Sequence, residues 1–201
     1  MTDHFFTINT NGTGLYKEKG SKFYAFAFAV QSKEQVAEEI ATLRKTYHDA
    51  RHFCYAYIIG NESELIRAND DGEPGHSAGD PILGQIKSAN LTNTLVIVVR
   101  YFGGTKLGVG GLINAYKTSA EEALSQSRKV KEYITSKVKI NYSYNATNEV
   151  MKLIDKYELK IIEQEFLEAC SLEASIIVSN HKNLIEEVQF LQDTNHDIKL
   201  I

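Results

Sequence analysis

The stretch VVRYFGGTKLGVGGLINAYK, residues 98–117, places five glycines within nine residues, between an apolar run and a segment with helical spacing. Glycine is costly in ordered backbone unless the chain needs a positive φ or the close approach of another group. The order of strand, glycine loop and helix allows backbone N–H groups and a helix N-terminus to hold an anion. Alternatively, the glycines only shape a tight turn where helix and sheet pack closely. The residue pattern leaves both interpretations open.

The spacing of these glycines excludes the common nucleotide-binding fingerprints. Residues 103–106 do not complete GxxxxGK[ST], and residues 108–111 lack the last glycine of GxGxxG. Arg100 and Lys106 bracket the loop, and Lys117 lies about two helical turns beyond the predicted start of the following helix. A nucleotide-binding fold is therefore not supported, whereas binding of a phosphate at the loop stays possible.

Composition and charge indicate an ordinary globular protein and limit its partners. The chain has 201 residues and a formal net charge of −4. Residues 1–136 carry 15 basic and 15 acidic side chains, and residues 137–201 carry 7 and 11. This balance excludes the global positive field of a dedicated nucleic-acid binder, so any such binding needs a local patch. We expect a cytoplasmic protein with reduced thiols, no membrane segment and no secretion signal.

The periodicity of apolar residues predicts two α+β domains, residues 1–132 and 133–201. In the first, residues 22–30 read as a strand with aromatic residues on one face and Phe23 with three alanines on the other. The small residues predict a helix packed closely on that face, and Ser32 with Gln35 predicts a capped helix start. The second domain reads βαββαβ, the ferredoxin-like order.

Two polar clusters are candidates for chemistry. The loop NDDGEPGHSAGDP, residues 69–81, contains Asp70, Asp71, Glu73 and His76, which could ligate a hard cation or supply a general acid and base. The spacing is not that of an EF-hand, and structural turn chemistry is favoured. In DARHFCYAY, residues 49–57, His52 and Cys54 share a strand face, but a cysteine among aromatic residues is typical of a core. No cofactor and no metal are expected.

These stretches, taken in order over residues 15–130, resemble the signature of the IMPACT/YigZ family. The second domain resembles the C-terminal domain of the bacterial members. The resemblance implies domains similar to domains IV and V of elongation factor G, and hence contact with RNA or the ribosome. Eukaryotic members regulate translation through an additional N-terminal RWD domain, which we do not expect here. The residues at shared family positions are Arg51, His52, Asp70, Asp71, Glu73, Arg100, Gly103, Gly104, Gly108, Gly110 and Gly111.

The chain departs from the family pattern at Gly75 and His76, where members commonly have a small residue followed by Gly-Thr. His76 either sits in a tolerant loop or alters the rim of a site. The resemblance otherwise favours a binding face lined by the glycine loop over a purely structural role for the glycines.

The leading hypothesis is a non-enzymatic, translation-associated protein that binds structured RNA or the ribosome. Its phosphate contacts are expected from the glycine N–H groups and from Lys22, Arg51, His52, Arg100, Lys106 and Lys117. Tyr101 and Phe102 are expected to stack on a base if they are exposed. The acidic second domain is expected to meet a protein. One alternative is a small-molecule or metal-dependent hydrolase built on the acidic loop, and another is a protein-interaction module.

Overall fold

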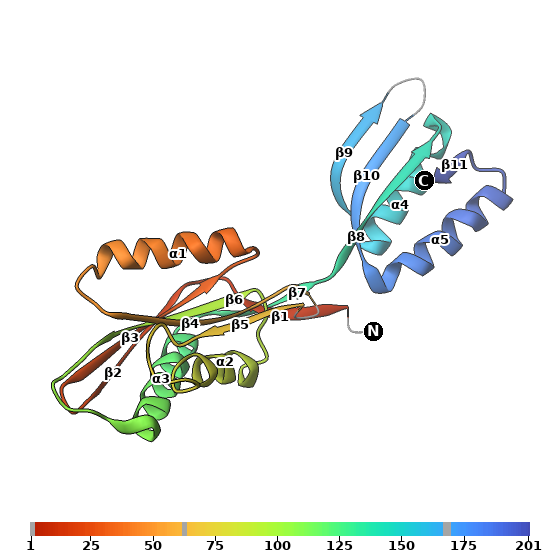
Figure 1. The fold of residues 1–201 in the computed structure, drawn as a ribbon. Coiled ribbons are helices and arrows are strands. Elements are labelled where there is room, and N and C mark those ends of the chain that lie inside the picture. Colours follow the sequence, from red (N-terminus) through yellow and green to blue (C-terminus); the bar gives the residue numbers. More distant parts are fainter. Residues whose placement is uncertain (1–2, 62–63, 167–169) are drawn as a thin grey trace. The chain divides into compact units, whose positions relative to one another are not determined.

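The computed structural model describes residues 3–61, 64–166 and 170–201 and divides into two compact units (Figure 1). One unit comprises residues 5–132, and the other comprises residues 133–201 together with the start of the chain up to His4. Both units combine helices with antiparallel sheets, which confirms the predicted α+β class. Within the described ranges, no helix combines the length and the apolar character that crossing a membrane requires.

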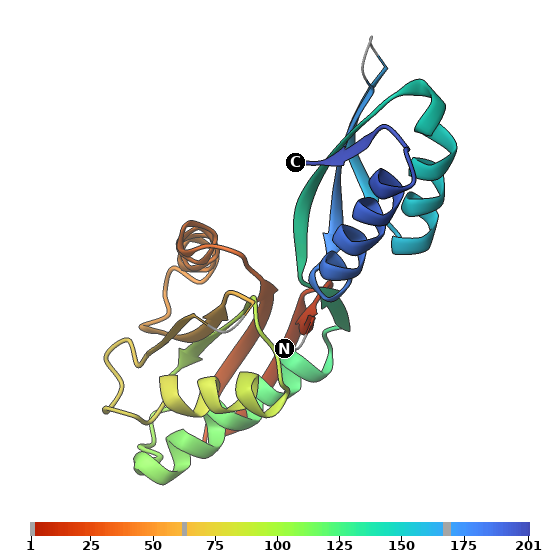
Figure 2. The same cartoon turned by 90° about the vertical axis from the view of Figure 1, so that its right-hand side faces the viewer.

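The larger unit is built on a five-stranded antiparallel sheet with strand order β2-β3-β6-β4-β5. Two helices cover one face of the sheet and one helix covers the other (Figures 1 and 2). A short two-stranded sheet pairs β1 with β7. The elements are β1 (His4–Ile8), β2 (Gly12–Glu18), β3 (Ser21–Ala29), α1 (Lys33–Thr46), β4 (His52–Ile59), β5 (Leu65–Asn69), α2 (Gly79–Ser88), β6 (Thr94–Tyr101), α3 (Gly108–Ser125) and β7 (Lys129–Tyr133).

The face of β3 with small residues receives α3, as predicted. Phe23, Ala25 and Ala27 have no exposed surface and belong to the core between the sheet and the helices α2 and α3. The neighbouring strand β2 approaches α3 even more closely. A Cβ on Gly14 would stand 2.7 Å from the Ser119 carbonyl oxygen. Small residues on two strands therefore let this helix lie directly on the sheet.

The sequence analysis missed the two strands before residue 20. Gly12 and Gly14 both lie within β2, where α3 crosses the strand too closely for any side chain. β2 and β3 form a hairpin whose two-residue turn, Lys19-Gly20, has positive φ at both positions. Such a turn matches the twist of paired strands.

The opposite face of the sheet carries the aromatic residues of β3 against Val36 and Leu43 of α1. The helix begins at the predicted cap, where Ser32 Oγ accepts a hydrogen bond from the N–H of Gln35 at 3.3 Å. The Gln35 side chain reaches one residue farther back than the usual reciprocal pair and accepts from the N–H of Gln31 at 2.7 Å.

The smaller unit has the predicted βαββαβ order. A four-stranded antiparallel sheet of order β11-β8-β10-β9 carries the two helices α4 and α5, whose buried residues share one core with those of the strands. Its elements are β8 (Thr135–Tyr142), a 3-10 turn (Tyr144–Ala146), α4 (Thr147–Tyr157), β9 (Lys160–Phe166), β10 (Cys170–Ile177), α5 (Val178–Asp193) and β11 (Ile198–Leu200).

Candidate functional site

The carboxylate of Asp70 organises the acidic loop, residues 69–81. Its oxygens accept hydrogen bonds from the backbone N–H groups of His76 at 2.9 Å, Ala78 at 2.9 Å and Gly79 at 2.8 Å. Gly79 begins α2, and the N-cap residue of this helix, Ala78, offers no side-chain acceptor. The Asp70 carboxylate therefore caps the helix N-terminus in its place. Burial alone raises the pKa of Asp70, but the three hydrogen bonds outweigh it and hold the pKa below its usual value.

Asp71 is also held by internal partners. Its two oxygens accept from Arg44 Nη2 at 3.0 and 2.9 Å, and Oδ2 accepts from the N–H of Phe53 at 2.7 Å. Its carbonyl oxygen lies 2.9 Å from Nδ1 of His52, which places the proton of that ring on Nδ1. These contacts tie the loop to α1 and β4. Asp70 and Asp71 therefore act as structural acceptors in this arrangement.

Glu73 forms a buried ion pair with Arg100, which the sequence analysis had assigned to a different candidate site. Arg100 Nη1 donates to Glu73 Oε1 at 2.5 Å, and the two side chains are only 7% and 4% exposed. The hydroxyl of Tyr116 donates to the same oxygen at 2.7 Å, and Cys54 Sγ donates to that hydroxyl at 3.2 Å. Arg100 is therefore a buried, paired cation and not the exposed phosphate contact that was expected.

The burial of this network also keeps its two weak acids, the Cys54 thiol and the Tyr116 hydroxyl, protonated. Burial raises the pKa of the Cys54 thiol and of the Tyr116 hydroxyl well above their ordinary values. A thiol that stays protonated is a poor nucleophile. Cys54 is accordingly a core residue whose single thiol proton is shared between the Asp70 carbonyl and the Tyr116 hydroxyl.

His76 points away from the carboxylates with which it was grouped. Its ring is exposed, and Nδ1 lies 2.6 Å from Oδ2 of Asp80, which raises the pKa of His76. Its backbone is left-handed, with φ of 64°, a conformation that glycine adopts more readily than other residues. Among the residues that the structure describes, no three His, Cys, Asp or Glu side chains form a group that could hold a metal ion.

The glycine loop, residues 102–111, is packed closely on one side only. A Cβ on Gly103 would stand 1.9 Å from the carbonyl carbon of Gly20 and 2.1 Å from the nitrogen of Ser21. The N–H of Gly103 donates to Ser21 Oγ at 3.1 Å. Gly103 is therefore required by the turn between β2 and β3, which lies directly against this loop.

The other side of the loop faces open space. Gly104 and Gly108 need their positive φ of 88° and 74°, but a Cβ on either would meet no atom within 4 Å. Gly110 has neither a positive φ nor a close neighbour. The helix α3 begins here without a side-chain cap, so the N–H groups of its first turn have no partner from a capping residue. Nothing within the described chain therefore explains the glycine at position 110.

Four lysines lie in the two segments that meet at this end of the sheet. Lys17 and Lys22 are cross-strand partners on the hairpin, and Lys19 lies in its turn, beside the loop that carries Lys106. All four are exposed, and none forms an ion pair with a residue in the described ranges. We call these four residues the lysine face. Lys17 and Lys19 were missed, although KEKGSK between two alternating segments is a recognisable hairpin signal.

Two depressions flank Arg100 and Phe102, which line both. One, of about 380 Å³, is lined by Asp49, Ala50, Arg51, His52, Arg100, Tyr101 and Phe102. The other, of about 370 Å³, has Glu73 and Arg100 with the apolar side chains of Pro74, Phe102, Leu107, Val109 and Leu112, and with Lys106 and Gly108. We call the second the Phe102 pocket. Lys117 and His76 line neither depression.

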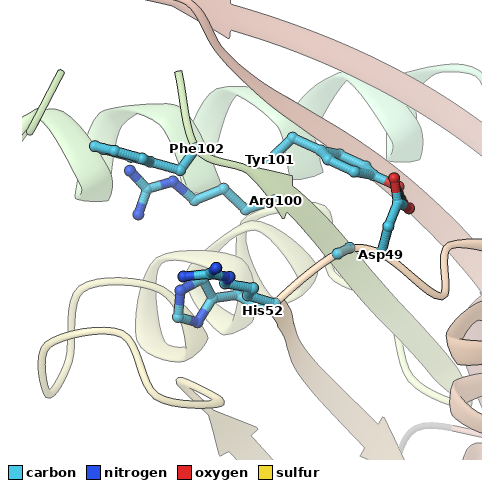
Figure 3. Close-up of a pocket in the computed structure, with 7 residues that line it drawn as sticks. Asp49, His52, Arg100, Tyr101 and Phe102 are labelled. Atoms are coloured by element: carbon cyan, nitrogen blue, oxygen red, sulfur yellow. Dashed lines mark hydrogen bonds between the residues drawn. The ribbon is translucent and has the colours of Figure 1, made fainter. Parts of the chain in front are cut away.

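The two aromatic residues beside the loop differ in availability. In Figure 3, Arg100 and His52 extend to one side of the strand, whereas Tyr101 extends to the other and meets Asp49. The Tyr101 hydroxyl donates to Asp49 Oδ1 at 2.5 Å, which raises the pKa of Tyr101 to about 12. Phe102 is 57% exposed and makes no such bond. Only Phe102 is therefore available for stacking on an external ring.

Comparisons with known proteins identify a family model, sequence relatives and a solved structure that are similar to this chain. A family model described as the Impact N-terminal domain matches residues 19–124, slightly more than half of the chain. IMPACT family member YvyE of Bacillus subtilis (strain 168) is 39% identical over 125 residues, which cover 62% of this chain and only 58% of that protein. IMPACT family member YigZ of Escherichia coli (strain K12) is 29% identical over 150 residues, 74% of each chain. A crystal structure of a hypothetical protein aligns with all of this chain and 98% of its own, with a TM-score of 0.73 and 23% identity, and shares its fold.

Proposed function

The chain belongs to the Impact N-terminal domain family, and from this premise we propose that it is a non-enzymatic, translation-associated protein of the cytoplasm that binds structured RNA or the ribosome. The binding surface is the lysine face together with Arg51, which is exposed at the start of β4. The uncapped first turn of α3 adds backbone donors to this surface.

The observation that carries the proposal is the meeting of Gly103 with the hairpin turn. This contact brings lysines from two segments about 80 residues apart to one end of the sheet. The chain has no global positive field, so a phosphate ligand needs a local excess of free cations. Cations without internal partners can neutralise phosphates and release their counterions. The lysine face meets that requirement, whereas Arg100 is occupied by Glu73.

The smaller unit takes a different partner in this proposal. Residues 137–201 carry 7 basic and 11 acidic side chains, which disfavours contact with a phosphate backbone. We propose that this unit meets a protein, with its acidic surface selecting against nucleic acid.

The test is a titration of a fluorescent RNA hairpin into the full-length protein at 50 and 200 mM KCl. About four phosphate contacts would reduce the affinity of the wild type on the order of a hundredfold between these concentrations. Lys19→Glu and Lys106→Glu should each weaken binding about tenfold and lower the salt slope by about 1 or more. Lys33→Glu is the matched control, because Lys33 is exposed at the start of α1, after the end of β3 remote from its turn.

The results of this titration distinguish RNA binding through the lysine face from a protein-interaction module. Circular dichroism checks that each variant keeps the fold. Binding that ignores salt, or that falls equally in the Lys33→Glu control, removes the lysine face from the proposal. Binding of a protein partner that survives high salt and does not require RNA would favour an interaction module instead.

A further inference from the structure

The Phe102 pocket lies beside the lysine face and differs from it in chemistry. Its volume of about 370 Å³ lies in the range of small-molecule sites, and most of its walls are apolar. Its polar groups are the buried Glu73–Arg100 pair and Lys106. A pocket with apolar walls and few polar groups suits a flat organic ring better than it suits a phosphate alone.

The ion pair leaves hydrogen-bonding capacity for a ligand. Both hydrogen bonds to the Glu73 carboxylate fall on Oε1, which leaves Oε2 as an acceptor. Arg100 uses Nη1, which leaves Nη2 as a donor, because Nη2 has no hydrogen bond to a described residue and is not among the buried unpartnered atoms. The Nε of Arg100 also has no partner in the described ranges, but it is buried and out of reach of a ligand. A ligand that presents a donor next to an acceptor would use both groups of the pair.

The carboxylate also excludes a simple anion from this part of the pocket. A phosphate placed beside Glu73 would meet a negative charge in a poorly solvated site. The edge of a nucleobase is neutral and carries donors beside acceptors, and its faces are apolar and flat. The chemistry of the Glu73–Arg100 pair therefore favours a base, and the phosphate must lie elsewhere.

The walls and rim place the remaining parts of a nucleotide. The Phe102 ring is 57% exposed, and the Arg100 guanidinium lies 5.7 Å from its centroid. Val109, also exposed at 52%, lines the pocket from the first turn of α3. That turn and Lys106 form the rim, where a phosphate would meet N–H groups and a cation without reaching Glu73.

We propose that the Phe102 pocket binds one unpaired nucleotide of an RNA strand. The base stacks on Phe102 with its edge toward Glu73 and Arg100, and its phosphate lies at the first turn of α3. This inference rests on the proposed function, which it deepens by naming the part of the RNA that is recognised. A free nucleoside 5′-phosphate has the same chemistry, so the test must separate the two sources.

The experiment uses two RNA hairpins that differ only in whether one 2-aminopurine is bulged or paired. The full-length protein should bind the bulged hairpin about tenfold more tightly, because base–aromatic stacking contributes that order of affinity. The fluorescence of the bulged 2-aminopurine should change and saturate with protein. Free adenosine 5′-monophosphate, titrated in parallel, should compete only at concentrations far above those of the RNA.

Two variants assign the preference to the pocket. Val109→Trp places a large ring at the pocket and should abolish the preference for the bulge. Ile113→Trp is the control, because Ile113 is exposed at 39% on the same helix and does not line the pocket. Phe102→Leu, which keeps an apolar side chain but removes the ring, should lower the preference about tenfold.

Each outcome has a distinct meaning. Equal affinity for the two hairpins, or a preference that survives Val109→Trp, overturns the nucleotide pocket while the lysine face still stands. Tight binding of free adenosine 5′-monophosphate without any preference for the bulge overturns RNA as the source of the ligand. Absence of RNA binding under all conditions removes the proposed function and the pocket together.

Discussion

The helices α2 and α3 begin in similar sequence, but the first N–H groups of α2 have a side-chain acceptor and those of α3 have none in the described part of the chain. Each follows a loop rich in glycine and charge that leaves a strand of the same sheet. At α2, the carboxylate of Asp70 accepts from the first N–H groups, and a Cβ on Gly79 would stand 2.6 Å from the nitrogen of Asn69. At α3 there is no side-chain cap, and a Cβ on Gly110 would meet nothing within 4 Å.

This difference separates a structural loop from a candidate binding surface. The acidic loop was also a candidate for chemistry, although structural turn chemistry was favoured there, and its aspartates are used as acceptors within the chain. The positive end of the α2 dipole is already neutralised, whereas that of α3 is open beside Lys106. Unused donors and cations, more than the density of polar residues, indicate where an external anion can bind.

The largest effect is expected from removing the acceptor at α2. Asp70→Ala leaves three backbone N–H groups without their partner and should lower the free energy of unfolding by about 3 kcal/mol. Urea denaturation measures this loss. Asp80→Ala is the control, since Asp80 is exposed on the same helix and its one ion pair within the described ranges is with the exposed His76, so it should change stability by less than about 1 kcal/mol. Equal losses in the two variants would mean that Asp70 does not close this helix start.

The next effect concerns the contact that assembles the lysine face. Gly103→Ala forces a Cβ against the backbone of Gly20 and Ser21, and the strain should cost about 2 kcal/mol of stability. Thermal unfolding followed by circular dichroism measures the cost. Because the hairpin turn must move, RNA affinity should fall as well. Unchanged affinity in a destabilised but folded protein would show that the meeting of the two segments does not build the binding surface.

A smaller effect of opposite sign is expected at Gly110. Alanine fits this helical position without contact and should stabilise the protein by up to about 1 kcal/mol. If a phosphate approaches the first turn of α3, the added methyl group should still weaken RNA binding several-fold. Chemical denaturation and RNA titration of the same variant measure both quantities. Higher stability with undiminished binding would remove the ligand as the reason for this glycine.

The smallest effect is the pH dependence that Asp70 contributes. Its pKa is held below the usual value of about 3.9, so the folded state binds this proton more weakly than the unfolded state does. Its contribution to stability is present above the unfolded pKa and is lost as the pH falls through the lowered folded pKa. Urea denaturation of the wild type and Asp70→Asn between pH 6 and 3 should show a shallower acid dependence in the variant. Parallel curves would contradict this assignment.

The fold could be predicted from local patterns because these patterns reflect burial. Strict alternation in β3 and the helical stripes of the smaller unit indicated which faces meet a core, and the structure confirms both. No strand was predicted for β2, whose glycines serve contact with α3, a partner more than 100 residues away along the chain. A glycine needed for tertiary contact has the same local signal as a glycine in a turn.

The candidate site was predictable only in part, for the same reason. Arg51 and Lys106 are exposed near the glycine loop as expected. Arg100, in contrast, forms an ion pair with Glu73, which lies 27 positions before it in the sequence. Lys117 is exposed on α3 and lines neither depression. Whether a charged side chain is free depends on its neighbours in space.

The sequence by itself determined the family, the α+β class and the faces of the strands that pack, because these follow from short-range periodicity and from motif order. The tertiary structure decided which charged side chains form ion pairs within the protein and which stay available to a ligand. The antiparallel register sets His52 opposite Arg100, and the acidic loop, anchored by Asp70 and Asp71, carries the Glu73 that pairs with Arg100. The hairpin turn meets Gly103 and so places the turn that carries Lys19 beside the loop that carries Lys106. Hydrogen bonds and ion pairs form between groups that the fold brings within about 3 Å, and separation along the chain does not specify that distance.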